Sequence, residues 1–210
     1  MSNTPKLLRP SDCSGQGVVV PSYDYDTLGA PFSVTLKNSV VVRVDPVTGD
    51  ELVKIPDPMG LLRTVVRTRV LDPRKLSGNE LKFVRHAIDA PANKIANFLD
   101  CTPEHLSRCE AGERVMSASA EKHLRLFAFC ATLFSDAAQL LEMGTDAAQV
   151  QPRPLNKKSD RMAKTFISTF LTMKIRAFRD PNESIEYVFY RRHLECDLPV
   201  DDDDWEPIAA

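Results

Sequence analysis

The spacing of hydrophobic residues changes along the chain, and each pattern predicts a different kind of secondary structure. Between residues 18 and 55, stretches rich in valine and threonine alternate with proline- and glycine-containing breaks, which is typical of short β-strands. We expect strands within GVVVP, APFSVTLKNSVVVRV and ELVKIP, with a turn over residues 45–51. In the following DPMGLLRTVVRTRV, Leu61, Leu62, Val65 and Val66 share one apolar side, which predicts a short helix.

In residues 76–144 the hydrophobic positions recur at the spacing of an α-helix. Ser77 followed three residues later by Glu80 is a capping box ahead of an apolar run, and a second helix is expected from Pro91. A third helix should begin after Thr102, whose side chain can accept a free backbone N–H of the first turn. Leu106 and Cys109 lie three residues apart, so they should form the inner side of this helix. A long fourth helix is expected from residue 117.

The chain after residue 145 has a mixed pattern. Residues 145–158 contain two prolines and read as a linker, and residues 159–194 as a dimerisation or partner-binding region. Its first part is either one amphipathic helix or two strands, and the alternation in ESIEYVFYRRHL predicts a half-buried strand. Residues 1–17 are polar and expected to be disordered, and residues 195–210 form an acidic tail.

These elements predict an α+β protein in three parts. A small N-terminal β module with its connecting helix spans residues 18–75, and an all-α helix-turn-helix domain of four to five helices spans residues 76–144. A C-terminal α/β extension follows. The chain has 43% hydrophobic and 27% charged residues and no apolar run of about 18 residues, so we expect a globular protein with no membrane partner.

The candidate chemistry argues against an enzyme or a metalloprotein. The five cysteines include no C-x-x-C pair, so neither a disulfide framework nor a closed zinc site is expected, and a reducing cytoplasm fits. No apolar signal-peptide core is present at the N-terminus. No Ser/His/Asp, Cys/His or paired-carboxylate arrangement occurs at a useful spacing. We therefore expect no catalytic residues, no metal and no cofactor.

The net charge of −2 conceals an uneven distribution. Residues 61–134 carry 12 lysines and arginines against 8 acidic residues, residues 152–192 carry 10 against 4, and residues 195–210 carry none against 7. The basic regions are able to supply phosphate contacts, or they are ordinary solvated surface. The tail is either solubilising or, through residues 201–204, a phosphate mimic that competes for the basic surface.

The segment KIANFLDCTPEHLSRCEAGER resembles the Cro/CI-type (XRE) helix-turn-helix family of transcriptional regulators. The likeness lies in Ala96, Thr102, Ser107-Arg108, Glu110 and Gly112, and it covers about 55 residues. The chain departs from the family at three places: Pro91-Ala92 replaces Ser-Gln, Asp100 replaces the glycine of the turn, and Cys109 replaces a tryptophan.

The resemblance implies a set of DNA-binding residues. Such proteins place the third helix in the major groove, while the second helix contacts the backbone. The residues implied to face the groove are Thr102, Glu104, His105, Ser107 and Arg108, with Asn93, Lys94 and Arg114 on phosphates. Arg108 is the expected reader of a guanine. In the other interpretation, His105 and Arg108 are solvated side chains of an ordinary helix.

The segment before this domain is similar to the linker region of MqsA-like antitoxin and regulator proteins. In those proteins a zinc-binding β module with C-P-x-C-G turns precedes the helix-turn-helix. Here Asp45 and Thr48 stand where the thiolates would be, so the resemblance implies a module that has lost its zinc ligands.

Two functions follow as hypotheses. The first is a DNA-binding regulator, such as a repressor, that binds double-stranded DNA as a homodimer on a near-palindromic operator, with Phe127, Phe134, Leu141, Phe166 and Phe170 available for the dimer contact. The second is an antitoxin or antiactivator-type interaction module that binds a partner protein, with DNA binding secondary.

Overall fold

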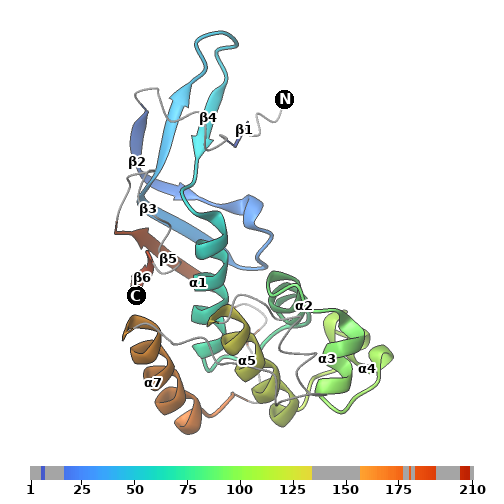
Figure 1. Ribbon diagram of the computed structural model, residues 1–210. Helices are drawn as coiled ribbons and strands as arrows, with labels where there is room; N and C mark the ends of the chain where they lie inside the picture. The colour runs from blue at the N-terminus through green and yellow to red at the C-terminus, as the bar shows by residue number, and fades with distance from the viewer. Residues whose placement is uncertain are drawn as a thin grey trace, which may run out of the picture. The chain divides into compact units, whose positions relative to one another are not determined.

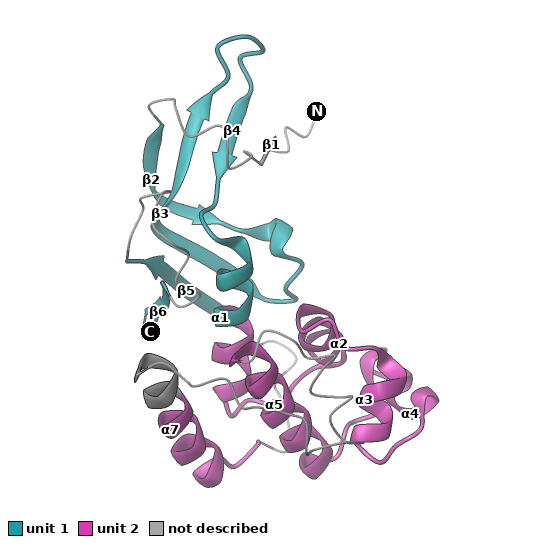
Figure 2. Cartoon of the chain, viewed as in Figure 1, with its two compact units in different colours: residues 1–64, 184–210 teal, residues 65–183 magenta. Residues whose placement is uncertain are grey.

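The computed structural model describes residues 6–7, 17–133, 157–176, 180, 183–192 and 204–208. The protein is an α+β protein whose chain divides into two compact units (Figures 1 and 2). Residues 1–64 and 184–210 form the sheet unit, and residues 65–183 form the helical unit. The helix α1 (Pro58–Leu71) begins in the first unit and ends in the second. No helix in the described ranges is long and apolar enough to cross a membrane.

The sheet unit is built around one long strand. Its described strands are β1 (Lys6–Leu7), β2 (Val18–Asp24), β3 (Ser33–Val44), β4 (Glu51–Lys54), β5 (Glu186–Arg191) and β6 (Trp205–Ile208), with a 3-10 helix η2 (Asp26–Leu28) after β2. β2 runs antiparallel along one edge of β3. The other edge of β3 is shared: its first half pairs with β5 in parallel and its second half with β4 antiparallel. β3 is therefore the strand on which the whole sheet depends.

A bulge marks the point where β3 changes partners. Val20 pairs with Val40, but Ser22 pairs with Lys37, so β3 has one more residue than β2 across this step. Asn38 lies in the bulge with a φ of 49°, a left-handed conformation that asparagine tolerates better than most residues. The three strands predicted between residues 18 and 55 are confirmed, but sequence periodicity carried no sign of this bulge.

Residues 184–210 belong to the sheet unit, whereas the sequence predicted a separate C-terminal region and an acidic tail. β5 lies inside residues 159–194, which we expected to form one region, and it pairs with β3; β6 lies inside the expected acidic tail, and it pairs with β5. Trp205 is buried, and its indole N–H donates to the carbonyl of Asp57 at 3.1 Å. The physical reason is that the first half of β3 has backbone N–H and C=O groups on its second edge that need hydrogen-bond partners. The distant strand β5, which contains the buried Phe189, provides them.

The helical unit consists of the end of α1, four helices that follow it, and a later helix. These are α2 (Gly78–Ala87), α3 (Ala92–Phe98), α4 (Pro103–Glu110), α5 (Ala118–Leu133) and α7 (Lys157–Thr172). The expected capping box is present, because the Ser77 side chain accepts from the Glu80 amide and the Glu80 carboxylate from the Ser77 amide. The apolar sides of these helices meet in a core that includes Val66, Leu81, Val84, Ile95, Leu106 and Leu124.

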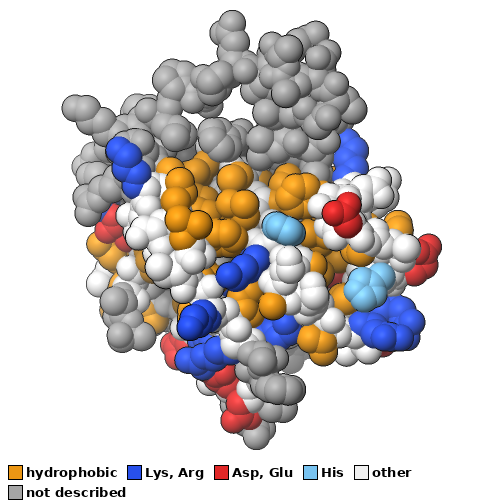
Figure 3. Space-filling view, turned by 90° about the horizontal axis from the view of Figure 1, so that it is seen from below, with side chains coloured by type: hydrophobic (Ala, Val, Ile, Leu, Met, Phe, Trp, Pro, Cys, Tyr) orange, Lys and Arg blue, Asp and Glu red, His pale blue; other side chains and the backbone are white. Residues whose placement is uncertain are grey.

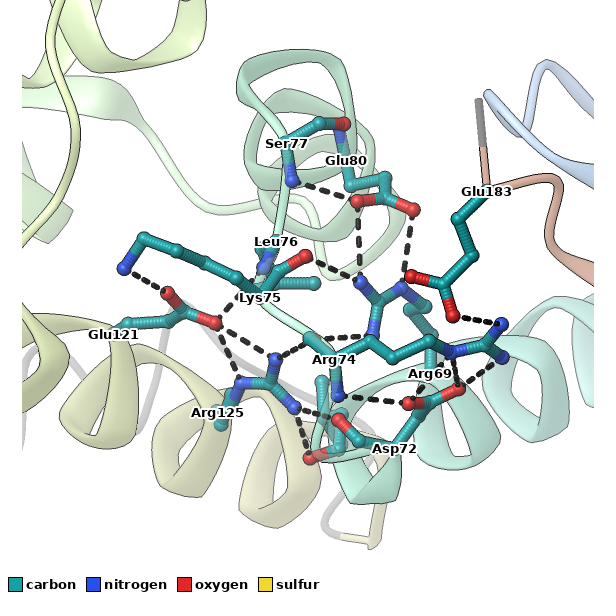
Figure 4. Close-up of polar contacts among 11 residues, drawn as sticks. Arg69, Asp72, Arg74, Lys75, Leu76, Ser77, Glu80, Glu121, Arg125 and Glu183 are labelled. Atoms are coloured by element: carbon teal, nitrogen blue, oxygen red, sulfur yellow. Dashed lines mark hydrogen bonds and ion pairs between the residues drawn. The ribbon is translucent and has the colours of Figure 1, made fainter. Parts of the chain in front are cut away.

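A buried network of ion pairs holds the loop between α1 and α2 (Figure 4). Arg69 forms a bidentate pair with Glu80 at 3.1–3.2 Å, and Arg125 pairs with Glu121 at 2.7 Å, all four side chains being fully buried. The two guanidinium groups also donate to the loop carbonyls of Asp72, Arg74 and Lys75 and to that of Val70. Charged groups removed from water need such complete pairing, so the network fixes where α2 begins.

Helix α7 packs within the helical unit, through aromatic side chains. Phe166 is buried and stacks on Phe129 of α5, with ring centroids 3.5 Å apart, and Phe170 stacks on Phe166 at 5.2 Å. The sequence left open whether this segment forms one amphipathic helix or two strands, and it forms the helix α7. Phe127, also buried, contacts Phe98 at 5.1 Å. Phe127 and Phe166 thus serve the intramolecular core, contrary to the expected dimer contact. Phe134, Leu141 and residues 145–156 lie outside the described residues, and residues 157–158, expected to end the linker, belong to α7.

Candidate nucleic-acid interface

Three consecutive helices end in the same hydrogen-bonded turn, and these turns shape the candidate site. After α2, Ala90 N–H donates to Arg85 and Asp89 N–H to His86; after α3, Cys101 donates to Ala96 and Asp100 to Asn97; after α4, Glu113 donates to Arg108 and Gly112 to Cys109. Each pair of bonds is a Schellman motif with a left-handed residue after the helix. These residues are Asp89, Asp100 and Gly112, with φ of 50°, 52° and 78°.

The Asp100 turn brings α4 close behind α3. Asp100 takes the left-handed conformation that the family resemblance associates with a glycine, which aspartate tolerates at some cost. Thr102 then caps α4, because its hydroxyl accepts from the His105 amide at 3.1 Å, and Pro103 occupies the first turn. Two short helices therefore follow one another across a tight turn, as the sequence predicted.

Helix α4 has one buried side and one exposed side. Leu106 and Cys109 are buried, as predicted. All five residues expected to face a groove are exposed, namely Thr102, Glu104, His105, Ser107 and Arg108. Hydrogen bonds to the Glu104 carboxyl lower its pKa. The larger contribution comes from the backbone amide of Glu104 itself and the smaller one from the Thr102 side chain. The His105 ring lies 3.6 Å from the Cys109 sulfur, so this imidazole lies one turn further towards the C-terminal end of α4.

Arg108 is held by an ion pair at the end of α4. Its Nε donates to Glu113 Oε2 at 3.2 Å, and both side chains are largely exposed, at 52% and 60%. Arg114 follows directly and is exposed, and its backbone amide, like that of Glu113, donates to the Arg108 carbonyl. Arg108 and Arg114 are thus brought to the same end of α4.

The residues expected on α3 are less open. Asn93 is exposed, but its side-chain oxygen accepts from the Lys94 amide at 2.9 Å. Lys94 is half-buried and takes part in an interaction of its own. Pro91 is the N-cap of α3, without a side-chain hydrogen bond, and α3 begins at Ala92, one residue later than predicted.

A part-buried ion pair fixes α4 against α2. Arg85 donates to both Glu110 oxygens, at 2.6 and 2.9 Å, and to the Ala90 carbonyl at 3.2 Å. The hydrogen bond that Arg85 donates to Glu110, together with the negative charge of Glu110, raises the pKa of Arg85. Gly78 starts α2 against the end of α4, because a Cβ there would lie only 2.6 Å from the carbonyl oxygens of Cys109 and Glu110. The exposed side of α4 is consequently a rigid surface.

The charge on this surface is balanced. Apart from Glu110, which is buried and paired with Arg85, the charged side chains of α3, α4 and their turns are Lys94, Arg108 and Arg114 against Asp100, Glu104 and Glu113. Many other basic residues of the 61–134 region are committed to internal pairs: Arg69, Arg74, Lys75, Arg85 and Arg125. On the face shown in Figure 3, lysines and arginines are likewise dispersed around hydrophobic side chains. The sequence excess of positive charge therefore does not become a basic patch on α4.

In the turn over residues 45–51, the side chains of Asp45 and Thr48 accept hydrogen bonds from the backbone of the turn itself. The Asp45 carboxylate accepts from the Val47 amide at 2.8 Å, which is the main cause of its lowered pKa, and the Thr48 hydroxyl accepts from Asp50 at 3.3 Å. Gly49 has a φ of 72°. Across the described part of the chain, no three histidine, cysteine or acidic side chains come together in a way that would hold a metal ion.

Two features of the site were missed from the sequence. Arg85 was not singled out, and Glu113 was not considered as a partner of Arg108. A signal for Glu113 existed: a glycine after a helix marks a Schellman motif, which brings together the residues five positions apart that precede and follow it. For Arg85 no comparable local signal exists, because its partner Glu110 lies 25 residues away.

No protein-family model, curated protein or solved structure matches this chain. The likeness to XRE-type and MqsA-like proteins therefore remains a resemblance.

Proposed function

We propose that this protein is a sequence-selective regulator that binds double-stranded DNA through α4. The single observation that carries the proposal is the exposed side of α4, where hydroxyl, imidazole and guanidinium groups project from a short helix held rigidly behind α3. A helix of this kind fits the major groove, where each base pair presents its own pattern of donors and acceptors. Arg108 is the residue that reads a base, and Arg114 contacts a phosphate.

The balanced charge of the surface limits what one copy does. Non-specific affinity comes largely from cations that neutralise phosphates, and three cations against three carboxylates supply little of it. A single helix of 8 residues also covers only a few base pairs. Two copies on a near-palindrome, about one helical turn of DNA apart, overcome both limits. We therefore propose a homodimer as the DNA-binding form.

Exposed apolar residues of the helical unit are available for the dimer contact. Leu126 on α5 and Ile167 and Leu171 on α7 are exposed, Leu171 at 76%. Ile167 and Leu171 are four residues apart and so lie on one side of α7. Light scattering at micromolar concentration, free and with DNA, tests this part; a strictly monomeric protein in both states would contradict the homodimer.

The test of the DNA-binding proposal is a selection of duplexes from a random-sequence pool with the full chain, followed by binding measurements on the selected site. We expect a guanine at one position, and Arg108→Ala should reduce the preference for it by about 1–3 kcal/mol in binding free energy. Lys174→Ala removes an exposed cation after α7 and is the matched control, which should keep the preference. No enriched sequence, or equal loss in both variants, would overturn the proposal.

A second candidate function is favoured by the surface of the sheet unit. Val18 on β2, Val44 on β3 and Val47 in the turn after β3 are exposed at 72%, 61% and 88%, and exposed apolar side chains of a sheet suit contact with another protein. In this alternative the chain is an interaction module, of the antitoxin or antiactivator kind, that occupies a partner through its sheet. A Val18→Lys/Val47→Lys variant that loses a co-purifying protein, with base preference retained, would support it.

A further inference from the structure

The contact between Glu113 and Arg108 follows from the way in which α4 ends. Glu113 is the third residue after α4, and its amide donates to the Arg108 carbonyl at 2.9 Å, while Gly112 donates to Cys109 at 3.1 Å. In this motif the side chains at the two positions that the longer bond joins frequently contact each other, usually through apolar groups. Here an ion pair of 3.2 Å takes the place of the apolar contact.

The backbone leaves this pair little freedom. Gly112 has a φ of 78°, which residues with a side chain rarely adopt, so the turn is held by the residue that suits it best. Glu110, two residues before Gly112, is anchored to Arg85 by two hydrogen bonds. The local backbone therefore places Glu113 beside Arg108 on the exposed surface.

The ion pair engages only one of the three guanidinium nitrogens of Arg108. Glu113 accepts a hydrogen bond from Nε. Within the part of the chain that the structure describes, no hydrogen bond or ion pair engages the terminal nitrogens Nη1 and Nη2 of Arg108. A bidentate contact with guanine uses two parallel N–H donors towards O6 and N7, and an arginine whose Nε is already held presents its two terminal nitrogens in a defined direction. A flexible arginine would instead lose rotamer entropy when it binds.

We propose that Glu113 is a positioning residue that orients Arg108 for base reading, an inference that rests on the proposed function. Exposed ion pairs contribute little to folding stability, so the contact is explained by what it does to Arg108. The carboxylate also repels phosphates, so it lowers affinity for every duplex alike while raising the preference for guanine.

The test compares duplexes that differ only at the position where Arg108→Ala removes the guanine preference. Glu113→Gln should reduce that preference by roughly three- to tenfold, a part of the roughly five- to hundredfold or greater discrimination expected of a bidentate contact. It should also raise affinity for both duplexes at low salt, because a negative charge is lost. The melting temperature should stay nearly unchanged, which separates positioning from a structural role.

Two controls make the result specific. Glu186→Gln removes the same charge from an exposed position on β5 and should leave the guanine preference unchanged. Glu113→Gln added to Arg108→Ala should cause no further loss of preference. If Glu113→Gln leaves the preference of an Arg108-dependent site unchanged or raises it, the positioning role is overturned. If the wild type has no such preference, the proposed function itself fails.

Discussion

At the scale of single residues, the strongest constraint in the helical unit is the full burial of four charged side chains. Arg125 donates to Glu121 and to the carbonyls of Val70, Asp72 and Arg74, so every nitrogen of its guanidinium has a partner (Figure 4). Burial lowers the pKa of Arg125 by disfavouring its charge, and Glu121 opposes this effect. Such a group is stabilising only as a complete set, because an unpaired buried charge is costly.

Arg125→Met should therefore lower the free energy of unfolding by about 3–5 kcal/mol, the cost of breaking a buried pair and leaving carbonyls without donors. Chemical denaturation followed by circular dichroism measures the loss. The double variant Glu121→Gln/Arg125→Met should be less destabilised than the sum of the two single variants, since neither member of the Arg125–Glu121 pair is left buried without the other. Lys75, which also pairs with Glu121, keeps the Met116 carbonyl as an acceptor. Additive losses would contradict the account of a coupled pair.

At the scale of elements, the ends of three successive helices decide how α3 and α4 lie. The turns after α2 and α3 use aspartate in a left-handed conformation, whereas the turn after α4 uses glycine. A residue with a Cβ is less stable there than glycine, although aspartate tolerates the region better than most residues. The two aspartates are therefore positions where the chain retains local strain next to the candidate interface.

Asp100→Gly should raise the free energy of unfolding by about 0.5–1 kcal/mol, because it removes the cost of the left-handed conformation. Asp100→Val should lower it, since a β-branched residue fits this region poorly. Thermal unfolding of the two variants beside the wild type measures both changes. Equal melting temperatures for the glycine and valine variants would mean that the turn relaxes and that its conformation is not a constraint.

At the scale of the whole molecule, residues near the C-terminus complete a sheet that the N-terminal residues begin. β6 pairs with β5, and Asp204 pairs with Arg191 at 3.5 Å, so the last acidic residue before β6 is engaged within the sheet unit. Residues 201–203 lie outside the described residues. The segment we expected to be an acidic tail thus contains a structural strand, and its removal should affect the fold.

Trp205→Ala should destabilise the sheet unit by about 3–5 kcal/mol, the usual cost of deleting a buried tryptophan side chain. The loss includes the hydrogen bond from the indole to Asp57. Unfolding followed by tryptophan fluorescence is not possible in this variant, because Trp205 is the only tryptophan in the chain, so circular dichroism is the measurement. Ile208→Ala, at an exposed position of the same strand, is the control and should cost far less.

Local patterns in the sequence were sufficient for much of the fold. The capping box at Ser77, the cap and proline at the start of α4, and the inward side with Leu106 and Cys109 were all predicted and confirmed. These features depend on residues within one or two helical turns of each other, so their physics is contained in short stretches of sequence. The exposure of the candidate DNA-binding residues on α4 follows from the same periodicity.

Contacts between distant residues were decided only by the tertiary structure. β5 joins β3 across about 150 residues, Arg125 reaches carbonyls more than 50 residues away, and Phe127 and Phe166 turn inward instead of outward. The pattern of a half-buried strand or of an apolar helix side indicates that this side packs against another element. It does not indicate which element, because many elements could cover the same side. The sequence by itself therefore determined the elements and the exposed side of α4, and the packing determined which basic residues remain on the surface.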